Sequence, residues 1–172
     1  MYEEKNIVIS GATVIFAGQP MGWTKDPLTI GIEDDKLKID DVQQKIGVVD
    51  IRRTKFSLII KLNLYEFTLE NIQKSFGLNA NIVYGSSSKT LSIDASGDYP
   101  EGELIIYCKG PDGVLRTIKY YKAKLIDRGD TSLDAYGATV IPITFQVLVH
   151  PDYDTALGII EEEYVPSNVV NS

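Results

Sequence analysis

One stretch limits the possible folds more than any other: a long two-residue alternation, followed at once by a helix signal, in residues 55–78 (KFSLIIKLNLYEFTLENIQKSFGL). Successive side chains of a strand point to opposite faces. One face of this segment carries Phe56, Leu58, Ile60, Leu62 and Leu64, and the other carries Ser57, Ile59, Lys61, Asn63 and Tyr65. The pattern predicts a long strand with one buried side.

The period changes at Thr68, which can act as the N-cap of a helix. Glu70 falls in the first turn, where the helix dipole favours a carboxylate, and Gly77 supplies a left-handed stop. The residues expected to pack against the body are Leu69, Ile72 and Phe76. A helix of about ten residues spans roughly 15 Å. It is too short to be stable alone, so we expect it to lie on a sheet.

The remaining chain reads as short strands separated by turn-forming residues. We expect strands in residues 7–17, 28–32, 36–42, 47–53, 91–93, 104–109, 114–127 and 138–149, with turns at 18–27, 33–35 and 110–113 and a loop at 79–89. Pro142 is expected at a sheet edge or a bulge because it lacks a ladder donor. Residues 153–164 look mildly helical.

These elements predict a mainly β fold, an antiparallel β-sandwich or rolled barrel with one flanking α-helix. We expect one domain in residues 1–152, followed by a C-terminal extension, residues 153–172, whose structure the sequence does not specify.

Composition excludes several classes of function. The chain has 172 residues, a net charge of −7, one cysteine and one histidine. A single His and a single Cys leave few constellations for nucleophilic catalysis, and turn carboxylates such as Asp98 and Glu101 lack a partner at catalytic spacing. We therefore predict no enzyme, no catalytic residues, no metal site and no cofactor. The acidic balance argues against a surface that binds nucleic acid by neutralising phosphates.

The sequence pattern also predicts no membrane-spanning segment and no secretory signal. No apolar run approaches the roughly 20 residues that cross a bilayer, so no membrane insertion is expected. The amino-terminal MYEEKNIVIS lacks the basic and apolar regions of a secretory signal. We expect the protein to fold in a cytoplasm.

The order of these parts resembles one family. The segment VVDIRRTKFSLIIKLNLYEFTLENIQKSFG, the loop residues Asp26, Pro27 and Leu28, and the closing run ATVIPITFQVLVHPD resemble the major tail tube proteins of tailed bacteriophages and phage-tail-like particles. The resemblance covers residues 7–152, and it is the succession of motifs that carries it.

The resemblance implies a structural subunit that closes into six-membered rings, which stack into a hollow tail tube. An extended hairpin would bridge adjacent rings, and its residues here would include Asp34, Asp35, Lys36, Asp40, Asp41, Gln43 and Gln44. The wall of the lumen would carry Ser57, Lys61, Asn63, Thr144 and Gln146, with nearby carboxylates making it acidic. DNA would pass through this lumen without specific binding.

The expected partners are further copies of the chain, together with sheath, tape-measure, tail terminator and baseplate proteins. The expected location is a virion tail assembled in a bacterial host cytoplasm.

Two alternatives stay open. The same architecture serves as the tube of a contractile injection system or a bacteriocin particle, and sequence does not separate these from a phage tail, or a contractile tail from a non-contractile one. A β-sandwich receptor- or carbohydrate-binding module is the other alternative. Its aromatic residues should cluster, whereas Trp23, Tyr84 and Tyr99 are scattered. Trp23 fits either a loop tip or an anchor in a subunit contact.

Overall fold

The computed structural model describes residues 11–24, 28–39, 50–75, 81–93, 98–110, 113–131 and 139–163. Within these ranges the chain is mainly β, with one α-helix. The sequence-predicted positions Asp40, Asp41, Gln43, Gln44 and Phe76, and the expected helix stop Gly77, lie outside the described residues.

The strands form one antiparallel sheet and one small ribbon. In chain order the elements are β1 (Thr13–Phe16), β2 (Gln19–Trp23), β3 (Thr29–Ile39), β4 (Asp50–Leu64), α1 (Leu69–Ser75), β5 (Val83–Tyr84), β6 (Lys89–Thr90), β7 (Glu101–Lys109), β8 (Leu115–Arg128), β9 (Ile141–Val147), a 3-10 turn (Pro151–Tyr153) and β10 (Gly158–Glu162). The sheet has eight strands in the order β2-β1-β7-β8-β9-β4-β3, with β10 added to β8, while β5 and β6 pair with each other.

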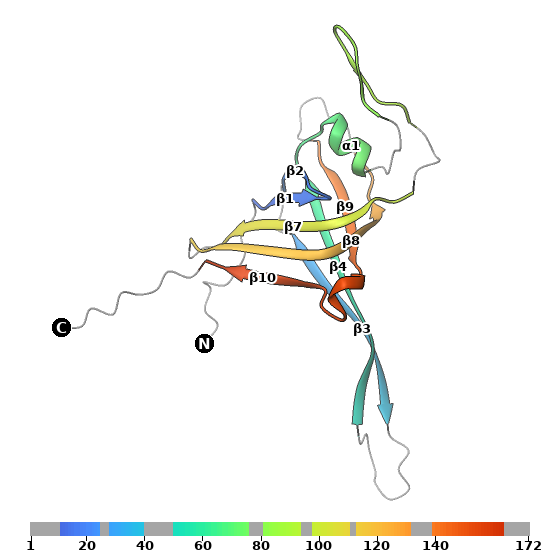
Figure 1. The fold of residues 1–172 in the computed structure, drawn as a ribbon, viewed down its shortest axis with the longest axis vertical. Helices are drawn as coiled ribbons and strands as arrows, with labels where there is room; N and C mark the ends of the chain where they lie inside the picture. Colours follow the sequence, from blue (N-terminus) through green and yellow to red (C-terminus); the bar gives the residue numbers. More distant parts are fainter. Residues whose placement is uncertain are drawn as a thin grey trace, which may run out of the picture.

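The sheet is rolled up (Figure 1). Its first strand, β2, comes back to β4 through a bridge between Thr24 and Leu64 and a 2.9 Å hydrogen bond from the Tyr65 amide to the Trp23 carbonyl. Six strands therefore enclose one core, while β3 continues beyond β4 as an outer strand. The predicted antiparallel, rolled β fold with a flanking helix is confirmed.

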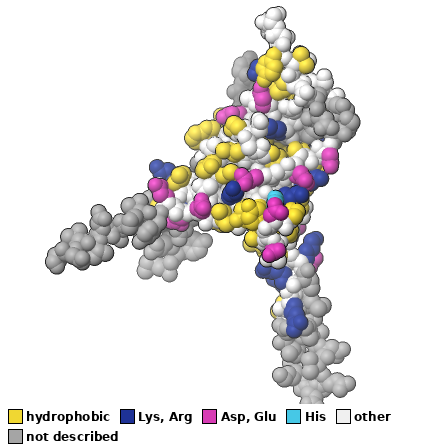
Figure 2. Space-filling view, viewed as in Figure 1, with side chains coloured by type: hydrophobic (Ala, Val, Ile, Leu, Met, Phe, Trp, Pro, Cys, Tyr) yellow, Lys and Arg dark blue, Asp and Glu magenta, His cyan; other side chains and the backbone are white. Residues whose placement is uncertain are grey.

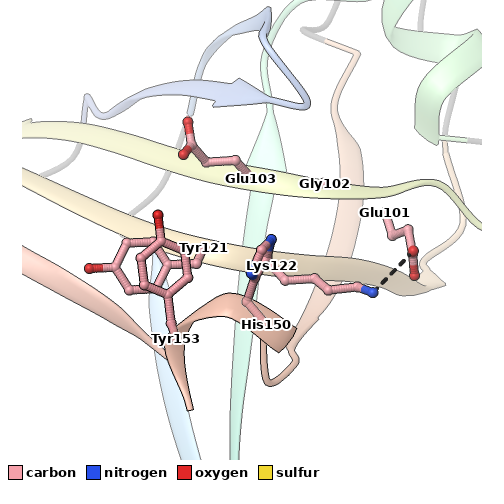
Figure 3. A pocket seen from close by; sticks show the side chains of 7 residues that line it. All are labelled: Glu101, Gly102, Glu103, Tyr121, Lys122, His150 and Tyr153. Carbon is pink, nitrogen blue, oxygen red and sulfur yellow. Dashed lines mark ion pairs between the residues drawn. The ribbon is translucent and has the colours of Figure 1, made fainter. Parts of the chain in front are cut away.

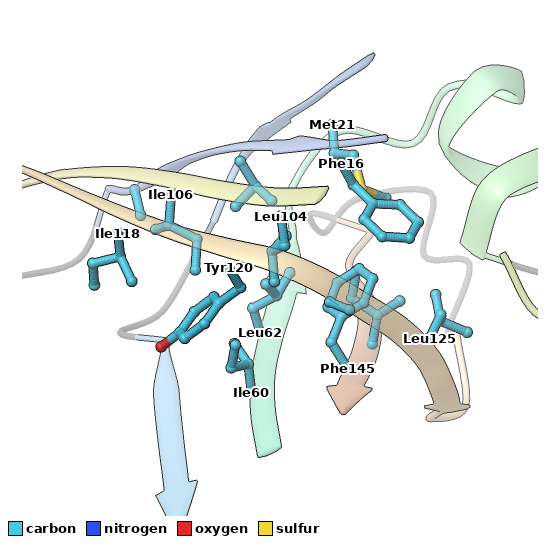
Figure 4. Packing of buried hydrophobic residues seen from close by; sticks show 14 of the residues in the cluster. Phe16, Met21, Ile60, Leu62, Leu104, Ile106, Ile118, Tyr120, Leu125 and Phe145 are labelled. Atoms are coloured by element: carbon cyan, nitrogen blue, oxygen red, sulfur yellow. The ribbon is translucent and has the colours of Figure 1, made fainter. Parts of the chain in front are cut away.

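The core is built from the alternating apolar residues (Figure 4). Ile60, Leu62 and Leu64 of β4 are buried, as the period-two pattern predicted. The rings of Phe16 and Phe145 meet at its centre with centroids 4.7 Å apart. A fully buried aliphatic or aromatic side chain contributes about 1.5–3 kcal/mol. The enclosed row of large side chains therefore supplies most of the driving force for rolling the sheet.

Two strands, β10 and β9, pair with the same edge of β8. Its first half pairs with β10, from Tyr120 opposite Gly158 to Arg116 opposite Glu162, and its second half pairs with β9. The helix expected in residues 153–164 is wrong, because the chain makes only the short 3-10 turn and then a strand. Gly158 allows this pairing, since a Cβ at that position would overlap the Lys119 carbonyl.

Two other local predictions are wrong for identifiable reasons. The turn expected at 18–27 contains β2, because Ala17 and Gly18 (φ 49° and 74°) form a two-residue turn of the type that closes a tight hairpin. The acidic turn expected at 33–35 lies inside the continuous strand β3. Asp34 is accommodated there because it forms ion pairs with Arg53 on the neighbouring strand β4 and with Lys36 on β3 itself.

Pro142 lies in an interior strand, between β8 and β4, and not at the predicted edge. Its carbonyl accepts a hydrogen bond from the Gly129 amide, just past the end of β8. The backbone N–H that proline lacks would therefore lie at the end of the hydrogen-bonded ladder between β8 and β9. Val149, the last residue of the strand expected at 138–149, follows β9 and is 59% exposed. The predicted loop at 79–89 contains the ribbon β5–β6, and no strand forms at 91–93.

Candidate assembly surface

The most prominent feature is the hairpin of β3 and β4, which projects away from the body (Figure 1). β9 pairs with β4 only from Ile59 to Leu64, so residues 50–58 pair with β3 alone. At ~3.3 Å per residue, this stem extends about 30 Å beyond the rolled sheet. A lone two-stranded hairpin is marginally stable in water. The stem is therefore the first candidate for a surface that contacts another chain.

Charged side chains fix the register of the stem. The Asp34 carboxylate lies 3.6 Å from Lys36 Nζ and 3.2 Å from Arg53 Nε, and the Arg53 guanidinium stacks over the Phe56 ring at 4.8 Å. The pairing shifts register between Asp35 and Lys36. The predicted hairpin residues Asp34, Asp35 and Lys36 therefore lie in the stem.

An apolar groove of about 460 Å³ runs between the base of the stem and β10. Its wall on the stem side is formed by Ile30, Ile32, Phe56 and Leu58, and the opposite wall by Tyr120, Leu157, Ile159 and Ile160. Ile32 is 62% exposed and Ile160 is 68% exposed. Burial raises the pKa of the Tyr120 phenol, which keeps that wall uncharged.

Sequence reasoning missed the groove because it read residues 153–164 as helical. The available signal was the pair Ile159-Ile160, two β-branched residues next to an acidic run, which is typical of an exposed strand.

The residues predicted to face a lumen share one surface, on the side of β4 and β9 away from the core. Lys61 lies opposite Thr144, and Asn63 lies opposite Pro142. Gln146 Nε2 donates a 3.0 Å hydrogen bond to the Ser57 hydroxyl, and Ser57 is buried. The structure thus brings the five residues together, with Ser57 covered and Lys61 exposed.

This polar face carries charged residues of both signs. Cross-strand pairing places additional charged residues on the same side of the sheet. The charged side chains there include Glu33, Asp35, Lys55, Lys61, Lys124 and Asp127. Acids and bases therefore both lie on the described part of this face.

Helix α1 packs through polar residues as well as through Ile72 of the predicted stripe. Thr68 caps it as predicted, accepting a 3.1 Å hydrogen bond from the Asn71 amide. Asn71 and Ser75 are the buried residues of the helix, whereas Leu69 and Ile72 are only partly buried and Ile72 packs against the core. The Asn71 side chain donates to the carbonyls of Met21 at 3.0 Å and Glu66 at 2.8 Å. Helix attachment therefore depends on hydrogen bonds to the backbone as well as on apolar contact.

A second hollow lies beside β7 and β8 and is lined by polar residues (Figure 3). Tyr121 and Tyr153 stack with ring centroids 3.9 Å apart, and His150 lies over Tyr153 at 5.1 Å. The Lys122 ammonium pairs with Glu101 at 3.2 Å. These contacts attach the 3-10 turn to β8, which positions β10.

The described residues contain neither a membrane-spanning helix nor a cluster of metal ligands. Across these ranges, no helix combines the length and apolar character that crossing a bilayer requires. In the same part of the chain, no three His, Cys, Asp or Glu side chains gather in a way that could hold a metal ion.

The comparisons with known proteins give the fold. No protein-family model and no curated protein matches the sequence. The structure is similar to a chain of the PVC sheath-tube complex in the extended state, an extracellular contractile injection system, with a TM-score of 0.51, 13% identity and 95% of each chain covered. It is also similar to a chain of the anti-feeding prophage cap, a tube-terminating cap (TM-score 0.49, 14% identity, 90% of this chain and 88% of that chain). This protein therefore shares the fold of a component of a contractile injection system.

Proposed function

We propose that this chain is the structural subunit of a hollow tube in a phage-tail-like particle, either a phage tail or a contractile injection system. Copies close into rings of six, and the rings stack. The observation that carries this proposal is the stem of β3 and β4, which extends about 30 Å from the body as an isolated two-stranded ribbon. The shared fold with a chain of a sheath-tube complex supports it.

Unpaired strand edges supply the means of assembly. Among the described strands, β3 ends the main sheet and β10 has a partner on one side only. Open edges either require protection or pair with another chain. Contacts between unlike edges are heterologous, and they generate a closed ring when the rotation between neighbours closes.

The polar face of β4 and β9 is proposed as the wall of the lumen. Duplex DNA carries one charge per ~1.7 Å of its axis, and it is held by clustered Lys and Arg. Acids such as Glu33 and Asp127 lie on this face together with Lys61, so its described residues form no purely basic cluster. DNA or another cargo would therefore slide past without adhering. Sheath, tape-measure, terminator and baseplate proteins are the partners that such a tube implies.

The decisive experiment removes the stem without disturbing the rolled sheet. Asp35 lies opposite Lys55, so residues 36–54 can be replaced by a two-residue Asn-Gly turn that closes the shortened hairpin. The matched control shortens the other ribbon by replacing residues 85–88 with the same Asn-Gly pair.

Negative-stain microscopy and sedimentation of wild type and both variants supply the readout. We expect rings and tubes from the wild type and the control, and a folded subunit that does not stack from the stem variant. A wild-type protein that stays a small oligomer at every concentration would contradict the proposal, and so would long tubes formed without the stem. A small oligomer at every concentration is the result that a receptor-binding module would give.

A further inference from the structure

The stem presents a face that combines apolar and basic groups. On the side that continues the core, Ile32 and Phe56 are 62% and 39% exposed, and Ile51 near the far end is 55% exposed. The register shift between Asp35 and Lys36 keeps Arg53 on the same side as Phe56, as their stacking shows. These apolar side chains remain in water in a single subunit.

The same side of the stem is also basic. Its described charged side chains are Asp34, Lys36 and Arg53, so two bases outnumber one acid. Figure 2 shows Lys and Arg side chains along the described part of the projection.

The groove beside β10 has the opposite character. Its walls are apolar, with Ile160 the most exposed side chain, and the strand ends in three exposed acids, Glu161, Glu162 and Glu163. Of these, Glu162 lies 3.4 Å from Arg116, and within the described residues no ion pair to Glu161 or Glu163 is present. An apolar groove with an acidic rim is complementary to an apolar stem with basic residues.

We propose that the groove between β10 and the base of β3–β4 receives the hairpin stem of a second copy of this chain. The inference rests on the proposed function and specifies which surfaces meet. Ile51 and Phe56 of one copy pack against Ile160 and Leu157 of the next, and Arg53 approaches the acids that end β10.

A second copy, and not the same subunit, supplies the stem. Within one subunit the register of β3 against β4 directs residues 50–55 away from the body, past the groove that Ile30 and Leu58 line (Figure 1). Each copy contributes one stem and one groove, so the contact is heterologous and continues from copy to copy.

The first test is cross-linking in trans. One protein carries Ile51→Cys and the other carries Ile160→Cys, both in a Cys108→Ala background. We expect a disulfide-linked dimer from the mixture under mild oxidation, with at least about tenfold more product than either protein forms alone. A matched mixture of Ile51→Cys with Ile93→Cys, a residue that is 88% exposed, controls for random collision. Equal yields from the two mixtures would overturn the assignment.

The second test separates this inference from the proposed function. Ile160→Asp places a charge in the groove, while Ile93→Asp is the control. We expect Ile160→Asp to raise the concentration required for assembly by about tenfold or more, because one buried isoleucine is lost from each contact. Circular dichroism should stay native in both. Tubes from Ile160→Asp at the wild-type threshold would refute the docking site while leaving the tube function intact. A wild type without rings would refute the function itself.

Discussion

The attachment of helix α1 gives the sharpest prediction about stability. Asn71 is 2% exposed, and its amide nitrogen is shared between the carbonyls of Met21 and Glu66, at 3.0 and 2.8 Å. Replacing Asn71 with leucine keeps a similar volume but removes both donors. A hydrogen bond contributes about 0.5–1.5 kcal/mol, and a buried acceptor left without a donor costs about 1–3 kcal/mol. The Met21 contact is buried and the Glu66 contact partly buried, so we expect Asn71→Leu to lower the free energy of unfolding by about 2–4 kcal/mol.

The measurement is urea denaturation followed by circular dichroism, at protein concentrations below the assembly threshold so that self-association does not add to stability. Exposed Asn81→Leu is the matched control and should change the free energy of unfolding by less than about 0.5 kcal/mol. For a chain of this size the Asn71 variant should melt about 4–16 °C lower. A loss below 0.5 kcal/mol would show that apolar contact alone holds the helix, as the stripe of Leu69, Ile72 and Phe76 predicts.

Two further predictions concern the strands around the groove. Gly158→Ala should detach β10, because the added Cβ overlaps the Lys119 carbonyl. Hydrogen exchange should then rise in residues 158–162 while the core strands stay protected. Unchanged exchange in residues 158–162 would contradict the pairing of β10 with β8. Cys108 should resist alkylation at pH 8 until the protein unfolds. Its thiol is buried, donates to the Arg116 carbonyl at 3.7 Å and has its pKa raised by burial. Modification at the rate of a free thiol would place Cys108 at the surface.

The rolled β core could be predicted because its signal is local and periodic. Ile60, Leu62 and Leu64 alternate with polar residues, and so do Ile141, Ile143 and Phe145; each set is buried as expected. The cap at Thr68 was equally readable, because the spacing from the capping side chain to Asn71 is fixed by helix geometry.

The errors arose where pairing partners override local composition. Glu33, Asp34 and Asp35 look like a turn, yet β4 lies beside them and supplies Arg53 for Asp34. Gln19 to Trp23 look irregular, but the turn at Ala17 and Gly18 brings them against β1. A partner distant in sequence is invisible to a reading of neighbouring residues.

The helix shows a different limit. Pattern reasoning assigned Leu69 and Ile72 to the buried stripe, because apolar spacing is the usual signal. Asn71 is the more deeply buried residue, and it hydrogen-bonds two backbone carbonyls. The assembly surface could be predicted only in part. The resemblance predicted an extended hairpin, whereas the groove depends on the pairing of β10 with β8, which the sequence pattern does not reveal.

The central claim is that copies of this chain complete one another along β3 and β10. Hydrogen exchange measured across a concentration series tests it most directly. On assembly, amides of residues 32–38 and 158–162 should gain protection, while those of β7, β8 and β9 keep the protection they have in the single subunit. Unchanged exchange at β3 and β10 in a sample that has formed rings would contradict the claim.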